Sequence, residues 1–346
     1  MKSIGFAIVG CGNIAPFHAE GICNTSGAEL IAVCDKDEAK AKELAEKFSA
    51  NVYFDYAEML TRDDIDVVNI CLPSGLHAPL SIQAANAGKH VMVEKPLDIT
   101  VEKCDSIIEA CNKNRVKLAT IFPSRFKASS MAIYKAIKSG RFGKLTLGDT
   151  NVKWYRSAEY YASGNWRGTW KFDGGGALMN QSIHYIDLIQ YFMGPIESVT
   201  AHCSTIVKDI EVEDTAVAIV KFKNGALGTI EGTTTAYPGL EAIVAVHGEN
   251  GSAIIDGESL VTWKFKDELP EDEQIRKELN KTISSGAADP VSSLDSAGHQ
   301  LQINDMVAAI NENREPMVNG ENGKKSVEII RAIYKSSENG GTKVML

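Results

Sequence analysis

Short apolar runs alternate with amphipathic segments over the first 122 residues of the chain. Apolar runs of this length, bounded by glycine, proline or polar residues, are typical of parallel strands that are buried on both faces. The alternation predicts a doubly wound α/β domain with a parallel sheet, which we expect to span residues 1–122. The last helix of this domain has an N-cap candidate at Thr100. The predicted strands are 4–10, 29–35, 66–73, 90–96 and 117–122, and the predicted helices are 37–48, 77–88 and 100–114.

The pattern changes after Phe122, where strand-like runs follow one another and are separated by turns such as "KNGA" and "GENGSA". These runs predict a mostly antiparallel sheet that carries a helix around Met179–Phe192. We therefore expect a second, α+β domain over residues 123–346, whose last helix is a candidate for packing back on the first domain. The predicted strands are 144–155, 198–206, 214–224, 225–235, 241–250 and 251–257, and the other predicted helices are 124–139, 266–281, 296–311 and 326–337.

Composition is that of an ordinary globular protein, since 44% of the 346 residues are apolar and 23% are charged. A net charge of -9 argues against broad binding to nucleic acids or acidic membranes. No apolar run reaches the roughly 18 residues that a membrane span needs. The short apolar run at the start of the chain lacks the features of a signal peptide and is read as a strand.

The seven cysteines are odd in number, form no Cys-x-x-Cys pair and lie partly inside apolar runs. Buried, reduced thiols are the best interpretation of this pattern, and they predict a cytoplasmic protein. No spacing typical of zinc ligands is present. We therefore expect no metal site.

A glycine-rich turn follows the first predicted strand and opens a helix. It has the form Gly10-x-Gly12-x-x-Ala15, with Asn13 and Ile14 inside it. Glycines at these positions let backbone N–H groups approach a pyrophosphate at the helix N-terminus. Asp35 ends the second predicted strand, where a carboxylate accepts hydrogen bonds from an adenosine ribose. This carboxylate would repel a 2′-phosphate, so NAD is favoured over NADP, although the neighbouring Lys36 softens that preference.

Polar residues also follow the next strands, whose carboxyl ends meet the cofactor edge of such a sheet. Pro73 and Ser74 turn the chain there, and His77 is either a residue that begins a helix or one that lines the cofactor. Glu94 and Lys95 end the strand "HVMVEKP". A lysine amine beside a partly positive cofactor suits proton transfer near neutral pH, and the alternative for Lys95 is a surface lysine.

These motifs together resemble the Gfo/Idh/MocA family, named after glucose–fructose oxidoreductase and inositol dehydrogenase. The resemblance rests on "GCGNIA", "AVCD", "LPSGLHA", "EKPL" and "GGGALMNQSIHYIDL" and covers nearly the whole chain. It implies a first domain that binds NAD(P) and a second domain with an open-faced sheet that binds substrate and builds oligomers. It also implies that Lys95 acts at the reacting hydroxyl and that Glu94 faces the cofactor.

A helix that follows Gly174–Gly176 is the predicted substrate element, with Asn180, His184 and Asp187 on one helical face. A neutral histidine accepts a proton from an alcohol, and an amide holds the oxygen. The alternative is a core helix whose histidine and aspartate satisfy each other. Many family members have an aspartate in place of Asn180, which weakens an assignment to inositol dehydrogenase. The "MNQSIH" version is similar to dehydrogenases that oxidise the 3-hydroxyl of a nucleotide-linked N-acetylated sugar acid.

The segment 151–172 is rich in aromatic and arginine side chains. Aromatic faces pack on sugar rings, and guanidinium groups hold carboxylates or phosphates, so Trp166, Arg156 and Arg167 are candidate substrate ligands. The alternative is an aromatic strand pair or a subunit contact. Arg125, which follows the last strand of the first domain, is a further candidate.

These observations predict an enzyme that oxidises a secondary hydroxyl of a sugar or nucleotide-linked sugar by hydride transfer to NAD. Lys95 or His184 would take the hydroxyl proton while the other stabilises the oxygen, so we expect both to meet one nicotinamide. We expect a homo-oligomer, either a dimer or a tetramer. Two alternatives remain at this point: a glycosidase-like enzyme that oxidises its sugar transiently with bound NAD, and a non-catalytic NAD sensor or scaffold.

Overall fold

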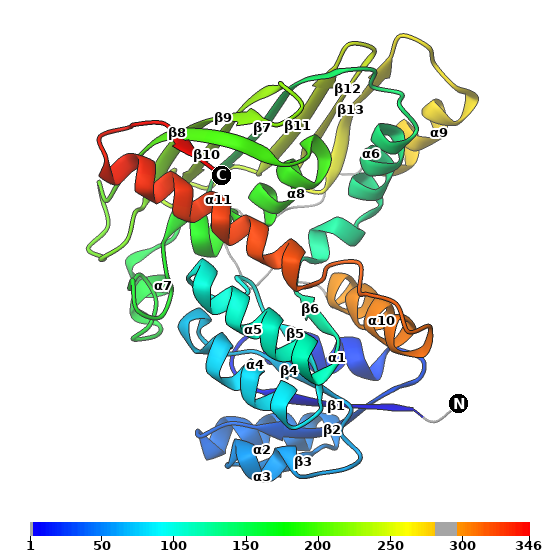
Figure 1. Cartoon of the computed structure of the whole chain (residues 1–346), viewed down its shortest axis with the longest axis vertical. Helices are drawn as coiled ribbons and strands as arrows, with labels where there is room; N and C mark the ends of the chain where they lie inside the picture. Colours follow the sequence, from blue (N-terminus) through cyan, green and yellow to red (C-terminus); the bar gives the residue numbers. More distant parts are fainter. Residues whose placement is uncertain (1–2, 281–295) are drawn as a thin grey trace. The chain divides into compact units, whose positions relative to one another are not determined.

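The computed structural model describes residues 3–280 and 296–346. The chain divides into two compact units. Unit 1 comprises Met1–Pro123 and Asp295–Lys324, and unit 2 comprises Ser124–Leu294 and Lys325–Leu346. Figure 1 shows the elements of both units, coloured along the sequence from blue to red. Segments from the start and from the end of the chain therefore build unit 1 together.

Unit 1 is built on a six-stranded parallel sheet in the order β3-β2-β1-β4-β5-β6. The order reverses between β1 and β4, and open α/β sheets bind ligands outside the carboxyl ends of their strands at such a point. The predicted doubly wound sheet is confirmed, although the sequence analysis missed β3, which is short and largely exposed. The strands are β1 (Ile4–Val9), β2 (Ala28–Cys34), β3 (Asn51–Tyr53), β4 (Val67–Ile70), β5 (His90–Val93) and β6 (Leu118–Thr120).

The helices of unit 1 begin where short polar side chains cap free backbone N–H groups. Asp37 accepts hydrogen bonds from the N–H groups of Ala39 and Lys40, and Thr100 accepts one from Lys103. The predicted N-cap at Thr100 is thus confirmed. The helices are α1 (Ala15–Cys23), α2 (Glu38–Phe48), α3 (Tyr56–Leu60), η1 (Ser74–Leu76), α4 (His77–Asn86), α5 (Val101–Asn114) and α10 (Ala297–Asn311).

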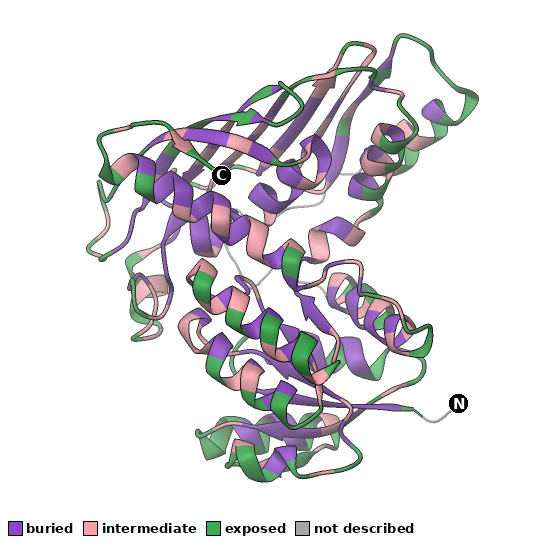
Figure 2. Ribbon diagram, in the orientation of Figure 1, coloured by how far each residue is buried: buried purple, intermediate pink, exposed green. Residues whose placement is uncertain are grey.

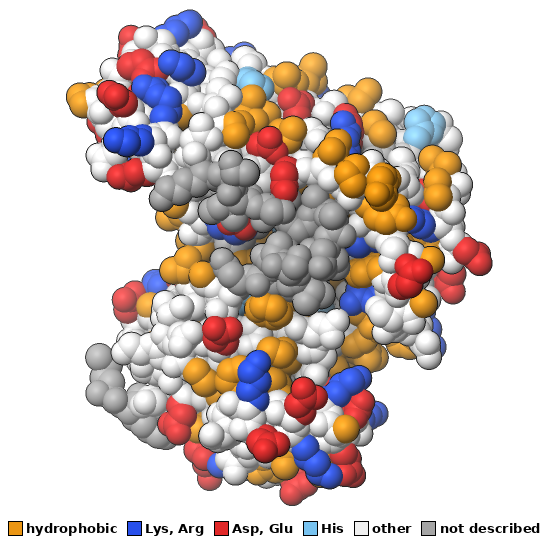
Figure 3. Space-filling view, turned by 180° about the vertical axis from the view of Figure 1, so that it is seen from behind, with side chains coloured by type: hydrophobic (Ala, Val, Ile, Leu, Met, Phe, Trp, Pro, Cys, Tyr) orange, Lys and Arg blue, Asp and Glu red, His pale blue; other side chains and the backbone are white. Residues whose placement is uncertain are grey.

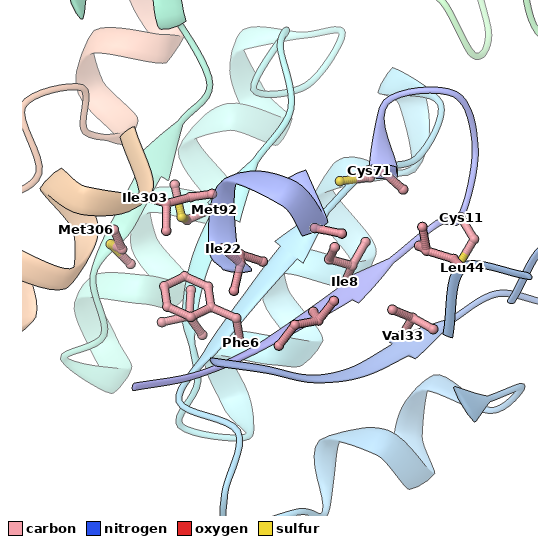
Figure 4. Packing of buried hydrophobic residues seen from close by; sticks show 14 of the residues in the cluster. Phe6, Ile8, Cys11, Ile22, Val33, Leu44, Cys71, Met92, Ile303 and Met306 are labelled. Carbon is pink, nitrogen blue, oxygen red and sulfur yellow. The ribbon is translucent and has the colours of Figure 1, made fainter. Parts of the chain in front are cut away.

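Helix α10 completes the hydrophobic core of unit 1, although it lies almost 300 residues from β1 in the sequence. Phe6 of β1, Ile22 of α1, Met92 of β5 and Ile303 of α10 belong to one buried cluster (Figure 4). Helices α1 and α10 approach closely, because a Cβ added at Gly21 would lie only 2.9 Å from Cδ1 of Ile303. Figure 2 shows the same core as buried strands between helices that are exposed on their outer faces.

Unit 2 is built on an eight-stranded sheet in the order β13-β12-β11-β7-β10-β9-β8-β14. All its pairs are antiparallel except β7 with β10, which confirms the mostly antiparallel sheet. The sequence analysis did not identify β13 or β14. The strands are β7 (Leu145–Lys153), β8 (Ile196–Ser204), β9 (Thr215–Phe222), β10 (Leu227–Thr233), β11 (Ile243–Gly248), β12 (Gly251–Asp256), β13 (Ser259–Phe265) and β14 (Val344–Met345).

Among the described residues, helices cover one face of this sheet and leave the other face open. Helix α8 packs on β7 and β11, and Ser336 of α11 accepts a hydrogen bond from the N–H of Ala201 in β8. Side chains of β9 alternate between buried and exposed, as one covered face requires. The helices are η2 (Pro123–Phe126), α6 (Ala128–Lys138), α7 (Ala158–Ala162), η3 (Ala177–Ser182), α8 (Ile183–Met193), α9 (Pro270–Leu279) and α11 (Gly320–Glu338), which starts in unit 1.

Two helix predictions need correction. The single helix predicted over 124–139 is interrupted, because Lys127 is extended (φ -66°, ψ 144°) and separates the 3₁₀ turn η2 from α6. The predicted helix 326–337 begins six residues earlier, at Gly320. The end of the predicted helix 266–281 lies outside the described residues. Among those residues, no helix has the length and apolar content that crossing a membrane requires.

The role of α10 in the core can be tested with two variants of the same helix. Ile303 is 1% exposed, so Ile303→Ala removes buried methylene groups and should lower the free energy of unfolding by about 2–5 kcal/mol. Leu301 is 44% exposed, and Leu301→Ala should change it by less than about 0.5 kcal/mol. Urea unfolding followed by circular dichroism measures both values. Equal losses in the two variants would contradict this packing.

Candidate active site

The glycine-rich turn after β1 has the backbone geometry that a close turn requires. Gly10 has a φ of +91°, and a Cβ added there would lie 2.3 Å from the carbonyl oxygen of Cys71. Only glycine fits this position without a shift of the backbone. Gly12 is exposed, and a Cβ added there would meet no heavy atom within 4 Å. The turn therefore packs tightly against the end of β4 at Gly10, whereas there is open space next to Gly12.

Helix α1 starts directly after this turn, and no side chain caps its N-terminus. Ile14 is its N-cap and provides no side-chain cap, and Pro16 occupies the first turn. Asn13 is exposed and Ala15 is buried. An uncapped helix N-terminus beside an open glycine turn fits a pyrophosphate, because backbone N–H groups and the helix dipole both favour an anion.

Asp35 lies at the end of β2, as the sequence predicts. One oxygen of its carboxylate accepts a hydrogen bond from the N–H of Cys11 (2.7 Å), and the other accepts one from Asp37 (2.9 Å). The side chain therefore ties the glycine turn to the end of β2. Each carboxylate oxygen has a second lone pair, so these bonds leave acceptor capacity for a ribose hydroxyl.

His77 joins two loops at the carboxyl edge of the sheet. Its imidazole is fully buried, and its Nδ1 and Nε2 each lie 2.8 Å from a backbone carbonyl oxygen, of Pro96 and Leu72 respectively. These contacts hold the loop after β4 against the loop after β5. Ser74 is buried at the start of η1, and Pro73 precedes it in an extended conformation. His77 is thus the first residue of α4, and contact of its ring with the cofactor stays a prediction.

Glu94 and Lys95 follow β5 with different exposure. Glu94 is 7% exposed, and its Oε1 lies 2.9 Å from Nε2 of His18 in α1. Its Oε2 accepts a hydrogen bond from the N–H of Lys95 (3.1 Å). Lys95 is half-buried and precedes a cis peptide bond to Pro96. The carboxylate therefore points into unit 1, and contact of Glu94 with the cofactor stays a prediction.

Burial and hydrogen bonding act in opposite directions on the Glu94 carboxyl. Burial favours its neutral form, but hydrogen bonds and charge from His18 and His299 outweigh this effect and hold its pKa well below the usual range. Burial lowers the pKa of His18, because the charged imidazole loses hydration, while the bond to Glu94 opposes this shift. Glu94 is therefore an anion at neutral pH.

In unit 2, Arg125 forms a buried ion pair. Its Nε and one terminal nitrogen donate to the two oxygens of Asp187 in α8 (2.7 and 2.6 Å). Arg125 is 2% exposed, and its guanidinium stacks on the Tyr191 ring at 4.4 Å. Asp187 thus has an arginine partner rather than the histidine of the core-helix alternative. A direct contact of Arg125 with substrate stays a prediction.

The arginines of the aromatic segment differ in exposure. Arg156 is 2% exposed, lies over the Trp154 ring and donates from Nε to Gln181 (2.9 Å). Arg167 is half-buried, between the rings of Tyr160 and Trp166, and donates to the Tyr160 hydroxyl (2.6 Å). Arg167 is therefore better placed than Arg156 to meet a ligand.

Asn180 and His184 lie on consecutive turns of different helical type. Asn180 belongs to the π-helical turn η3, and His184 to the first turn of α8; both are half-buried. A π-helical turn inside a helix changes the direction of its side chains, and such turns are frequent at functional sites. Asn180 donates to Asp173 (2.5 Å) and accepts a hydrogen bond from Gln181 (2.9 Å). The sequence analysis missed Asp173 and Gln181, although both lie in or beside the motif that it quoted.

Glu213 caps η3 from a buried position that the sequence analysis did not single out. Its carboxylate accepts hydrogen bonds from the N–H groups of Gly176 (2.9 Å) and Leu178 (2.8 Å), and from the Tyr334 hydroxyl (2.8 Å). Burial nevertheless raises the pKa of Glu213 to about 7, against the effect of these donors. The start of the helix that carries Asn180 therefore rests on a carboxyl that changes charge near neutral pH.

Family models match both parts of the chain. Residues 4–122 match the NAD-binding Rossmann fold of the GFO_IDH_MocA oxidoreductase family, and residues 134–346 match its C-terminal alpha/beta domain. The chain belongs to the Gfo/Idh/MocA oxidoreductase family. This membership confirms the resemblance found in the sequence, the NAD-binding fold of the first domain and the assignment to oxidoreductases.

Two solved dehydrogenases and one further relative are similar to this chain. The WlbA dehydrogenase from Bordetella pertussis, solved with NADH and UDP-GlcNAcA, is 34% identical with a TM-score of 0.91, over 100% of this chain and 98% of that one. The WlbA dehydrogenase from Chromobacterium violaceum, solved with the same ligands, is 36% identical with a TM-score of 0.90, over 100% and 96%. Myo-inositol 2-dehydrogenase from Thermotoga maritima is 31% identical over 75% of this chain and 78% of its own length.

The titration of Glu213 predicts a pH-dependent loss of stability. The carboxyl has a pKa of about 7 in the folded protein and 4.5 without the fold. Its contribution to stability is therefore full below pH 4.5 and is lost as the pH rises through 7. Glu213→Gln cannot ionise and should remove that decline, which amounts to about 3 kcal/mol.

Urea unfolding of both proteins between pH 5 and 8 measures this effect. Glu249→Gln, at an exposed turn between β11 and β12, is the control and should keep the decline of the unmodified protein. Parallel pH profiles of the unmodified protein and Glu213→Gln would show that Glu213 does not titrate in this range.

Proposed function

We propose that this chain is an NAD-dependent dehydrogenase that oxidises a secondary hydroxyl on the sugar of a nucleotide-linked sugar acid. The observation that carries this proposal is its likeness, over the full length, to two dehydrogenases solved with NADH and UDP-GlcNAcA. In this assignment, residues 1–122 bind the dinucleotide and residues 123–346 bind the sugar substrate and form subunit contacts. Both units contain polar side chains that suit these roles.

The residues at the carboxyl edge of the unit 1 sheet fit NAD. The open space at Gly12 and the uncapped start of α1 suit the pyrophosphate, and Asp35 suits a ribose diol. Bound NAD+ supplies the acceptor for the hydride that leaves the carbinol carbon, so the products are a ketone, NADH and one proton. The chain has to bind and orient both reactants and to remove that proton.

We assign the removal of the substrate's hydroxyl proton to Lys95 and His184. One of them accepts it from the substrate hydroxyl, and the other donates a hydrogen bond to the oxygen as its negative charge develops. Asn180 is an amide and cannot act as a base, but it can hold a substrate oxygen. Asp173 and Gln181 fix the orientation of this amide, since both hydrogen-bond to it.

Arg167 and Trp166 are our candidates for the charged part of the substrate. The Arg167 guanidinium is held between two aromatic rings and retains donors beyond its bond to Tyr160. A carboxylate or phosphate matches such a planar donor group. A substrate that carries both a sugar ring and these anions therefore suits this segment better than a neutral polyol does.

A substrate panel tests the function. With NAD+, UDP-GlcNAcA should be oxidised at least about tenfold faster than myo-inositol, free sugars and free sugar acids, measured by NADH absorbance. Comparable rates with the neutral polyol would contradict a nucleotide-sugar substrate. Release of free sugar without net accumulation of NADH would instead support the glycosidase-like alternative.

Variants of Lys95 test the assigned chemistry. Lys95→Ala should lower kcat by about 10²- to 10⁴-fold, the usual contribution of general acid–base catalysis, with the Kd for NADH within about twofold. The control is Lys89→Ala. Lys89 lies directly before the amino end of β5, at the end of the strand opposite to Lys95, and donates to the backbone carbonyl of Arg62. Unchanged turnover in Lys95→Ala would remove Lys95 from the mechanism.

We also propose that the chain forms a homo-oligomer through the open face of the unit 2 sheet. Leu147, Val217, Ile219 and Leu227 are exposed on neighbouring strands, and Leu147 pairs with Leu227 in register. Figure 3, which views the molecule from behind, shows apolar side chains gathered on unit 2. An exposed apolar patch on a sheet is typical of a subunit interface.

Light scattering coupled to size-exclusion chromatography tests this interface. Ile219→Lys combined with Leu227→Lys should lower the molar mass to that of a monomer, because the charges cannot be buried between subunits. Met131→Lys, at an exposed position on α6, should leave the mass unchanged. A mass that is the same for all three proteins would exclude this face as the contact.

A cytoplasmic location is the last part of the proposal. All seven cysteines are free thiols, and burial raises the pKa of each of them. Such thiols suit a reducing compartment.

A further inference from the structure

Three buried side chains from different elements of unit 1 meet in its interior, and one of them belongs to the residue that precedes Lys95. They are His18 of α1, Glu94 at the end of β5 and His299 of α10, with exposed fractions of 0%, 7% and 4%. Nε2 of His18 lies 2.9 Å from Oε1 of Glu94, and Nε2 of His299 lies 3.6 Å from the same oxygen. The two imidazole ring centroids are 4.9 Å apart. We call these three residues the buried triad.

The hydrogen-bond pattern shows which ring nitrogen of His18 carries the proton. The side-chain amide of Asn69 in β4 donates to Nδ1 of His18 (2.8 Å), so this nitrogen is the acceptor. Nε2 then carries the proton and donates it to Glu94. Nδ1 of His299 has no hydrogen-bond partner within the described parts of the chain. His18 therefore has a fixed tautomer, and His299 can donate toward Glu94 only when its proton lies on Nε2, the nitrogen that faces the carboxylate.

The second oxygen of Glu94 connects the buried triad to the proposed catalytic residue. Oε2 accepts the hydrogen bond from the backbone N–H of Lys95, so the carboxylate spans the two histidines on one side and the Lys95 backbone on the other. The titratable groups that act on Glu94 are these two histidines, and the charge of Glu94 in turn acts on the buried thiol of Cys71.

Core packing alone does not require this arrangement. A buried carboxylate loses several kcal/mol of hydration, and apolar side chains of similar volume usually stabilise a core equally well or better. The surrounding core of α1 and α10 consists of such residues, among them Ile22 and Ile303. The polar cluster lies only at the carboxyl end of β5, beside Lys95. Its position therefore points to a role in function rather than in packing.

We propose that His18 and His299 are positioning residues for Lys95, which act by holding the Glu94 carboxylate against the Lys95 backbone. The carboxylate fixes the direction in which the Lys95 side chain leaves the sheet and keeps a negative charge at a constant distance from its amine. This inference rests on the proposed function, in which Lys95 handles the substrate proton. Misplacement of a catalytic group by about 1 Å can reduce turnover by 10²-fold.

A divalent metal is the competing explanation for two imidazoles and one carboxylate, since their ligand atoms lie within 4.8 Å of one another. The proton that Asn69 assigns to Nε2 of His18 occupies the lone pair that a metal would need. The 2.9 Å contact is also an ordinary hydrogen-bond length. The geometry therefore favours a proton between His18 and Glu94, and metal analysis of the purified protein becomes part of the test.

The test compares leucine and glutamine replacements of each histidine. His18→Leu and His299→Leu remove the two imidazoles that face Glu94 and should lower kcat by about 10- to 100-fold, with the Kd for NADH and the KM for substrate within about threefold. The acid limb of the kcat profile should move by about 0.5 pH unit or more, because the distance from Glu94 to the Lys95 amine changes. His18→Gln and His299→Gln keep an N–H donor and should recover most of the lost turnover.

His90→Gln is the matched control, because His90 is a partly buried histidine at the opposite end of β5, where its Nδ1 accepts a hydrogen bond from Lys117. It should keep kcat and the pH profile within about twofold. NADH binding and circular dichroism identify any variant that fails to fold, and the glutamine variants then decide the outcome.

The outcomes separate this inference from the proposed function. If Lys95→Ala is inactive while all four histidine variants keep normal kcat and pH profiles, the positioning role is wrong and the function stands. If Lys95→Ala retains turnover, the proposed function itself fails. One equivalent of zinc or another divalent metal in the purified protein, removed together with activity by a chelator, would overturn the positioning role in favour of a metal site.

Discussion

The carboxyl edge of the parallel sheet in unit 1 depends on one constraint: several of its loops are held by side chains that hydrogen-bond to backbone groups at this edge. Asp35 holds the glycine turn, His77 holds the loops after β4 and β5, and Glu94 holds Lys95. Asp98 adds a bond to the N–H of Ala78 at the start of α4 (2.8 Å). Buried backbone groups need partners, so these contacts satisfy that need and fix the site together.

Unit 2 meets the same need around the helix that carries Asn180 and His184. Asp187 is paired with Arg125, and Glu213 caps the first turn of η3, so both ends of this segment rest on buried carboxylates. The two carboxylates differ, however, in their partners. Asp187 faces a guanidinium, whereas Glu213 faces only neutral donors, which is why burial dominates its titration. The start of the segment that carries Asn180 is therefore sensitive to pH through Glu213.

The sequence predicted the fold class and the elements that carry the site, because apolar periodicity and turn residues are local signals. It missed β3, whose residues are mostly exposed, and it joined η2 to α6 because nothing in the composition of residues 124–139 marks the extended Lys127. It also placed Asp35, Glu94 and Lys95 at strand ends, where the structure has them, while their roles in the site stay predictions. It could not identify the buried triad, since His18, Glu94 and His299 are brought together only by the packing of α1 and α10.

Burial decides which charged groups remain available to a ligand. Arg125 and Arg156 carry the same chemistry as Arg167, but their guanidinium groups are buried against partners within the chain. If either guanidinium moved away from its partner, a buried carboxylate or amide would be left without a hydrogen bond, and this loss costs several kcal/mol. Arg167 has a hydroxyl as its partner and aromatic faces as its support, so it can add a ligand anion without breaking an ion pair. Of these three arginines, Arg167 is therefore the one that the proposed function assigns to the anion of the substrate.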